Sequence, residues 1–159
     1  MSRTISFPTV PVEEVPVPGA HSGPEPNRPV VLVVDDEAVI ADSLASILNA
    51  SGYAAMAAYD GLGALETAQL VPPELLVSDV ALPGMNGIEL AIAVKRDFPD
   101  CKIILFSGHA STADLLATAK NDSERQFVLL KKPVHPKDLL ACVSEKLKSG
   151  IQIGAANAF

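Results

Sequence analysis

The chain has 159 residues, enough for one domain of ordinary size, and 48% of them are hydrophobic, so an apolar core can form. Tryptophan is absent and aromatic residues make up 4%, which predicts an aliphatic core. The formal net charge of −7 argues against nucleic acid and anionic membrane surfaces as partners, because both attract clustered Lys and Arg.

The cysteines and the apolar runs favour a cytoplasmic protein. Cys101 and Cys142 lie far apart and outside any CxxC or Cys/His ligand spacing, so we interpret both as reduced packing residues. No basic-then-apolar signal peptide opens the sequence, and no apolar run approaches the roughly 20 residues that span a bilayer. We therefore expect no contact with a membrane.

The two ends of the sequence differ from its middle. Residues 1–28 contain six prolines, which remove backbone donors and interrupt helices and sheets, so this stretch is predicted to be a disordered arm. Within it "FPTVP" has a PxxP spacing, which is common in proline-rich stretches. Residues 149–159 follow the last helical pattern and are predicted to be a flexible tail. The folded domain is expected over residues 29–148.

The first half of this domain begins with a strand. "PVVLVVDD", residues 29–36, is a nearly all-apolar run typical of a parallel strand covered on both faces. Apolar residues then recur at helical spacing from Ile40 to Leu48, and Gly52 provides a C-terminal stop. "YAAMAAY", residues 53–59, is a weaker second strand, and "GLGALETAQL", residues 61–70, predicts a short helix.

The second half repeats the alternation. "ELLVSD" (74–79), "KIILFSG" (102–108) and "QFVLLKK" (126–132) predict the third, fourth and fifth strands. Helices are expected after the third strand, closing before Pro99, and over residues 112–119. A last helix has Pro136 in its first turn. Its inward-facing apolar residues are Leu139, Leu140, Val143 and Leu147.

Five alternations of strand and helix define an α/β domain. Crossovers between parallel strands are right-handed and place helices on both faces of the sheet. The sequence therefore predicts a doubly wound five-stranded parallel sheet, for which we assume the strand order 2-1-3-4-5 of that fold class. In such sheets ligands bind beyond the carboxyl ends of the strands, where the strand order reverses.

Three acidic residues are predicted to meet at this reversal. Asp35 and Asp36 end the first strand, and Asp79 ends the third. Close carboxylates repel each other unless a proton or a cation neutralises them, and an all-oxygen set without His or Cys suits Mg²⁺. At the same edge Ser107 ends the fourth strand and Lys132 the fifth. A hydroxyl and an ammonium beside a Mg²⁺–carboxylate cluster predict a pocket for a phosphoryl group.

Each of these residues has an ordinary explanation when it is considered alone. An Asp at a strand end is often a turn former or a helix cap, Ser107 would be a turn residue, and Lys132 a solvated charge. Capping accounts for Asp35 or Asp36 but not for both together with Asp79. Joint placement at four strand ends favours the functional interpretation.

Four segments carry a resemblance to a known family. "VLVVDDE", "SDVALPGMNGIEL", "IILFSG" and "LLKKP", in this order and spacing, resemble the receiver domain of two-component response regulators, a CheY-like domain with a flavodoxin-like fold. The resemblance covers about residues 30–148. It implies that Asp79 is the phosphoacceptor and that Asp35 and Asp36 hold Mg²⁺ together with it.

The resemblance also assigns roles around the acceptor and exposes one departure. It implies that the backbone carbonyl of Ala81 is a further metal ligand, that Ser107 is the switch hydroxyl and that Lys132 contacts the phosphate. Leu129 occupies the output-switch position, where the family usually has an aromatic residue; Phe127 lies two residues earlier on the same face. "AKNDSERQ" replaces the usual small-residue link before the fifth strand, so the output surface is expected to be rebuilt.

The implied function is that of a stand-alone receiver. Asp79 would take a phosphoryl group from the phosphohistidine of a sensor histidine kinase or a histidine phosphotransfer protein, with Mg²⁺ as cofactor. The protein would hydrolyse its own acyl phosphate, would not be a turnover enzyme, and would signal through contact with an unknown downstream protein. The alternative is a non-phosphorylated interaction module of the same fold. A flavin carrier would need a Ser/Thr-rich phosphate loop and a phosphatase a DxD motif, and the sequence has neither.

Overall fold

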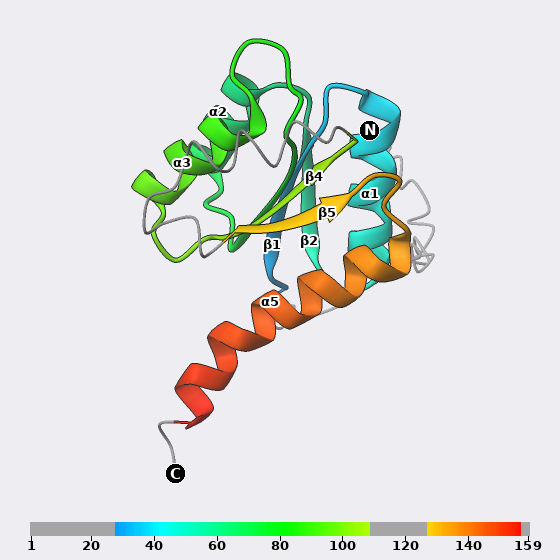
Figure 1. Ribbon diagram of the computed structural model, residues 1–159. Coiled ribbons are helices and arrows are strands. Elements are labelled where there is room, and N and C mark those ends of the chain that lie inside the picture. Colours follow the sequence, from blue (N-terminus) through cyan, green and yellow to red (C-terminus); the bar gives the residue numbers. More distant parts are fainter. Residues whose placement is uncertain (1–27, 109–126, 157–159) are drawn as a thin grey trace, which may run out of the picture.

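The structure is a computed structural model that describes residues 28–108 and 127–156, with side chains described as far as residue 148. These residues form a parallel sheet and four helices (Figure 1). In chain order the elements are β1 (Val30–Val34), α1 (Ala38–Ala50), β2 (Ala54–Ala58), α2 (Gly61–Leu70), β3 (Leu75–Asp79), α3 (Gly87–Asp97), β4 (Lys102–Ser107), β5 (Phe127–Lys131) and α5 (Pro136–Ala156). The helix predicted over residues 112–119, the segment "AKNDSERQ" and residues 1–27 of the predicted arm lie outside the described residues.

The sheet has the predicted topology. Its five strands are all parallel and lie in the order β2-β1-β3-β4-β5, which confirms the doubly wound fold. The register places Val34 opposite Ser78, and Asp79 opposite Phe106. The carboxyl ends of β1, β3 and β4 therefore share one edge, and the strand order reverses at β1.

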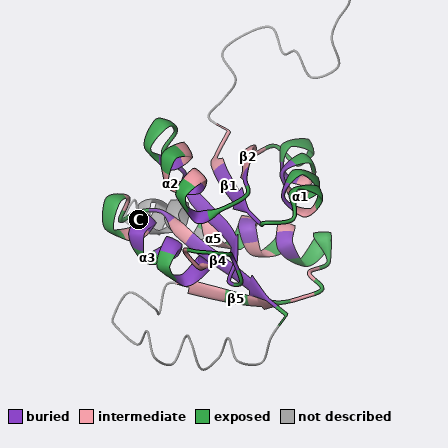
Figure 2. Cartoon of the chain, turned by 90° about the horizontal axis from the view of Figure 1, so that it is seen from above, coloured by how far each residue is buried: buried purple, intermediate pink, exposed green. Residues whose placement is uncertain are grey.

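Helices cover both faces of the sheet, and alternate strand residues supply one core on each side. Val31 and Val33 pack on the side of α1 and α5, whereas Leu32 and Val34 pack on the side of α2 and α3. All five residues of β3 are buried. Strands enclosed on both faces need apolar side chains at nearly every position, which explains the continuous apolar runs of β1 and β3. Figure 2 shows the buried strands inside and the exposed residues on the outer surfaces of the helices.

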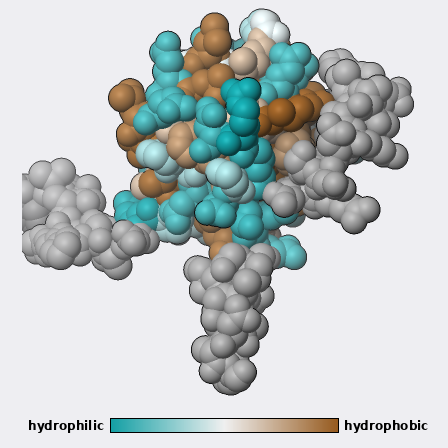
Figure 3. All heavy atoms as spheres, turned by 90° about the vertical axis from the view of Figure 1, so that its left-hand side faces the viewer, coloured by the Kyte–Doolittle hydropathy of each residue, from teal (hydrophilic) through white to brown (hydrophobic). Residues whose placement is uncertain are grey.

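The core is aliphatic, as predicted. Among the described residues Phe106 is the one aromatic side chain in the buried hydrophobic set, which otherwise consists of aliphatic residues and Cys101. The face viewed from the side of α2 and α3 is mixed: hydrophilic residues run down its middle, and hydrophobic residues gather toward its top and sides (Figure 3). The exposed apolar residues Leu62, Leu70 and Ile92 belong to these two helices.

Helix α5 differs from the sequence prediction. We expected the helix to end at Lys148 and a flexible tail over residues 149–159, but α5 continues to Ala156. No proline interrupts residues 149–156, and the glycines at 150 and 154 each cost only about 1 kcal/mol relative to alanine inside a helix. The end of α5 therefore extends beyond the sheet (Figure 1).

Candidate functional site

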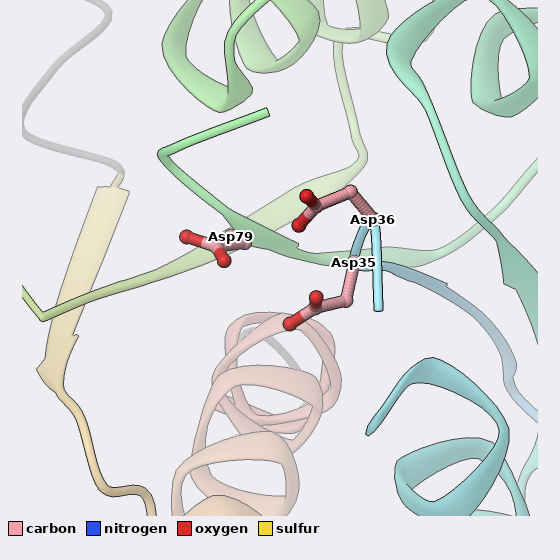
Figure 4. A group of neighbouring side chains, drawn as sticks. All are labelled: Asp35, Asp36 and Asp79. Atoms are coloured by element: carbon pink, nitrogen blue, oxygen red, sulfur yellow. The ribbon is translucent and has the colours of Figure 1, made fainter. Parts of the chain in front are cut away.

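Three carboxylates meet where the strand order reverses. Asp35 and Asp36 directly follow β1, and Asp79 is the last residue of β3. One oxygen from each carboxylate lies within 4.8 Å of the others. Figure 4 shows Asp35 and Asp36 extending from the end of β1 toward the end of β3. Asp35 and Asp79 are buried and Asp36 is exposed, so the cluster opens to solvent on one side.

The carboxylate of Asp79 is held from two sides. Its Oδ2 atom lies 2.7 Å from the Nζ atom of Lys132, and its Oδ1 atom accepts a hydrogen bond of 3.0 Å from the backbone N–H of Ala81. Ala81 thus turns its backbone amide toward the carboxylate of Asp79. The role of its carbonyl as a metal ligand stays a prediction.

Lys132 links β5 to both acidic strand ends. Its Nζ atom also lies 3.6 Å from Oδ2 of Asp35 and 5.2 Å from the centre of the Phe106 ring. Burial lowers the pKa of Lys132, but the hydrogen bond and charge of Asp79, together with the charge of Asp35, outweigh burial and raise this pKa overall. The ammonium ion is therefore stabilised. The neighbouring Lys131 is exposed, as the alternation of side chains along a strand predicts.

Asp35 is the carboxylate of the cluster whose burial is least compensated. Its Oδ1 atom accepts a hydrogen bond of 2.9 Å from the N–H of Glu37, but its buried Oδ2 atom has no hydrogen-bond partner among the described residues. Burial raises the pKa of Asp35, and the charges of Asp79 and Asp36 add to this effect against the Glu37 amide and Lys132. The N-cap residue of α1 is Glu37, so capping by Asp35 or Asp36 does not explain the pair.

The donor set fits a hard divalent cation. A buried carboxylate oxygen without a hydrogen-bond partner is unfavourable, and two further carboxylates lie within reach of the same point. Mg²⁺ binds through oxygen ligands, usually one or two carboxylates plus waters, and the exposed side at Asp36 gives water access.

The loop after β3 is shaped by two glycines. Gly84 has a φ of +75°, a conformation that other L-residues rarely adopt. Asn86 caps α3 by accepting a hydrogen bond of 2.8 Å from the N–H of Glu89. A Cβ atom on Gly87 would clash with the backbone oxygen of Asp79. The start of α3 can therefore lie directly against Asp79 only because position 87 is glycine.

The two remaining predicted positions lie on β4 and β5. Ser107 ends β4 and is buried, and its backbone carbonyl accepts a hydrogen bond of 2.9 Å from the N–H of Lys132. Leu129 lies in the middle of β5, opposite Leu105, and its side chain is 42% exposed. Their assignments as switch hydroxyl and output-switch position stay predictions.

Sequence reasoning missed two contributors to the site. Phe106 lies beneath the ammonium of Lys132, and Gly87 permits the close approach of α3. The Asn-Gly pair at 86–87 indicated a sharp turn, but nothing in the sequence indicated which backbone atoms that turn would touch. In the sequence, Phe106 is one of several apolar residues of the predicted fourth strand, and nothing there indicates its contact with Lys132.

Comparison with known proteins identifies the family and agrees with the fold. The family model for the response regulator receiver domain matches residues 31–144, and the chain belongs to this family. It is 31% identical over 121 residues to the DNA-binding response regulator MtrA of Mycobacterium tuberculosis, covering 76% of this chain and 51% of that protein. The chain thus spans about half the length of the MtrA relatives that it matches.

Two further relatives are close to the receiver domain in length. The response regulator receiver protein CpdR of Brucella abortus is 32% identical over 117 residues, covering 74% of this chain and 95% of that protein. The crystal structure of a CheY-like receiver domain protein from Methanospirillum hungatei JF-1 has a TM-score of 0.69 and 30% identity, covering 79% of this chain and 98% of that one.

Within residues 28–108 and 127–156, no helix is long and apolar enough to cross a bilayer.

Proposed function

We propose that the chain is the phosphoacceptor of a two-component phosphorelay and that Asp79 receives the phosphoryl group. The observation that carries the proposal is the carboxylate of Asp79, held by Lys132 and the Ala81 amide beside the unpartnered oxygen of Asp35. The donor would be the phosphohistidine of a sensor histidine kinase or a histidine phosphotransfer protein. The protein would act in the cytoplasm.

The chemistry requires little more than positioning and charge neutralisation. An oxygen of Asp79 attacks phosphorus in line, a P–O bond forms as the P–N bond breaks, and the electron pair returns to the imidazole nitrogen of the donor. The ammonium of Lys132 lies beside the attacking carboxylate and neutralises charge on the equatorial phosphoryl oxygens. Bound Mg²⁺ would supply further neutralisation, held by Asp35, Asp36, Asp79 and the carbonyl of Ala81.

The acyl phosphate is then lost by hydrolysis. A water molecule attacks phosphorus, the bond to the Asp79 oxygen breaks, and inorganic phosphate leaves. In this cycle the protein's own Asp79 is phosphorylated and then dephosphorylated, and no external substrate is converted. The protein is therefore not a turnover enzyme in the ordinary sense. Output would occur through contact with a downstream protein, and the net charge of −7 disfavours direct binding to nucleic acid.

The acceptor assignment can be tested by intact-mass measurement after incubation with acetyl phosphate and Mg²⁺. Wild type should gain one phosphoryl group, and Asp79→Asn should gain none. Asp42→Asn is the matched control, because Asp42 is an exposed carboxylate of α1 outside the cluster, and it should label like wild type. Labelling of Asp79→Asn would contradict the assignment. A wild type that never labels, even with a phosphorylated histidine donor, would favour the non-phosphorylated interaction module.

A further inference from the structure

A pocket lies at the end of the sheet opposite the acidic cluster. It has a volume of about 580 Å³ and is formed by the segments that lead into β3 and β4, together with α5. Its apolar lining consists of Pro72, Pro73, Phe98, Pro99, Cys101 and Leu147. Three acidic residues, Glu74, Asp97 and Asp100, and one lysine, Lys102, complete it. The pocket is thus apolar within and mainly negative at its polar positions.

The first residue of β1 is hydrogen-bonded to one residue of this pocket. The backbone N–H of Val30 donates a hydrogen bond of 3.0 Å to Oε2 of Glu74, and the N–H of Glu74 donates one of 2.9 Å to the carbonyl of Val30. Glu74 also lines the pocket. Residues 1–27 therefore join the described domain only a few residues away from the pocket's acidic side.

The first part of the arm is chemically complementary to the pocket. Residues 2–11, "SRTISFPTVP", contain an aromatic residue at Phe7, two prolines and a valine, with Arg3 as the charged group and no acidic residue. The acidic residues of the arm come later, beginning at Glu13. Apolar groups gain free energy by burial in a pocket of this kind, and a guanidinium pairs well with carboxylates.

We propose that residues 2–11 bind in this pocket of the same chain, with Phe7 against the Phe98 side of the lining and Arg3 at the carboxylate of Asp100. Residues 12–28 form the tether. Seventeen residues of extended chain span at most roughly 55–60 Å, so the tether is long enough to bring residues 2–11 to the pocket. Because residues 2–11 and the pocket belong to one chain, the effective concentration of this contact does not depend on the protein concentration.

The absence of tryptophan from the sequence makes the contact directly measurable. Phe7→Trp introduces a single indole at the proposed contact, and Val17→Trp introduces one in the tether as a matched control. The indole of Phe7→Trp should emit at shorter wavelength and be quenched several-fold less by acrylamide than that of Val17→Trp. The shift should be independent of protein concentration, because the contact is within one chain.

Charge reversal tests the predicted pairing. Adding Arg3→Glu or Asp100→Lys to Phe7→Trp should return its emission to that of the control, and combining both reversals should restore the shift. Arg3 lies outside the folded domain, so Arg3→Glu stays informative even if Asp100→Lys unfolds. Identical emission of Phe7→Trp and Val17→Trp would overturn the proposal. A shift that appears only as protein concentration rises would overturn it in favour of binding to a second copy.

Discussion

Asp35 shows how one residue can be unfavourable for folding and useful for the site. Its side chain is fully buried, one of its oxygens has no hydrogen-bond partner in the part of the chain that the structure describes, and the ammonium of Lys132 lies 3.6 Å from that oxygen. Because the folded state raises the pKa of Asp35, the ionised carboxylate destabilises the fold at neutral pH. This penalty is absent well below pH 3.8, the ordinary pKa of an Asp carboxyl group. It grows as the pH rises from that value to the raised pKa of the folded state, and it is constant above the raised pKa.

We predict that Asp35→Asn stabilises the metal-free protein at pH 7, by about 1 kcal/mol, because it removes a buried charge and keeps the acceptor for the Glu37 amide. Mg²⁺ at ten times its Kd should stabilise wild type by about 1.4 kcal/mol and the variant by much less. Urea unfolding with EDTA or with Mg²⁺ measures both effects, and Asp42→Asn is again the control. A variant that is less stable without metal and gains the full effect of Mg²⁺ would contradict the assigned role of Asp35.

Gly87 is the second residue whose replacement should be informative. In Gly87→Ala the new methyl group would meet backbone atoms of Asp79 and Val80, which cannot rotate away. We expect a loss of about 1–3 kcal/mol in the free energy of unfolding, because either α3 or the backbone of Asp79 and Val80 must move. The same movement should slow phosphorylation of Asp79. Gly108→Ala is the control, because its Cβ would lie 3.9 Å from Lys132, and it should change stability by less than about 0.5 kcal/mol. Equal stability of the two variants would show that the loop adjusts freely.

At the scale of elements, most of the fold and the core of the site could be predicted from the sequence. Buried parallel strands need apolar runs, and parallel strands bring their carboxyl ends to one edge, so Asp35 and Asp79 were expected to meet. The length of α5 could not be predicted, because its last turns follow a weak helical pattern. The contacts of Gly87 and Phe106 depend on the exact loop path and strand register, which local patterns do not specify.

The link from β4 to β5 gives a prediction about signalling. Ser107 ends β4, and its carbonyl is hydrogen-bonded to the N–H of Lys132 after β5, so movement of one strand end reaches the other. Ser107→Ala keeps this backbone hydrogen bond and removes only the hydroxyl, the group that the receiver resemblance assigns as the switch. If the hydroxyl drives the movement, the variant should keep phosphorylation by acetyl phosphate but lose the change in hydrogen exchange that beryllofluoride causes in β5, since a ligand shifts only states that it binds differently. Ser43→Ala, at an exposed position of α1, should respond like wild type. A full response in Ser107→Ala would disprove the coupling.

At the scale of the whole molecule, the sheet separates two cores, and one cysteine belongs to each. Cys101 is part of the core beneath α2 and α3, whereas Cys142 packs on the side of α1 and α5. Both thiols are free. Burial raises the pKa of Cys101 to about 12, with smaller opposing effects from Lys95 and the Leu76 amide. At pH 8 roughly one Cys101 thiol in ten thousand is ionised.

We therefore predict that iodoacetamide at pH 8 modifies Cys142 in the native protein well before Cys101, and that both react at similar rates in urea. Peptide mass spectrometry measures the two rates. Cys101 should react only when the core opens, so stabilising the protein should slow its modification and leave Cys142 almost unchanged. As the pH rises above 9, ionisation of Cys101 in the unfolded state should lower stability. Rapid modification of native Cys101 would contradict its placement in the core.

Strand β3 has the acidic cluster at one end and the pocket residue Glu74 just before the other. Five residues of extended chain place these ends roughly 13–17 Å apart, and free-energy changes at sites separated by more than about 10 Å usually add. Since all five residues of β3 are buried, no side chain of this strand forms an exposed surface that joins the two ends. A change at one end should leave the other as it is, so the pocket end of this molecule can be redesigned without altering the carboxylate end.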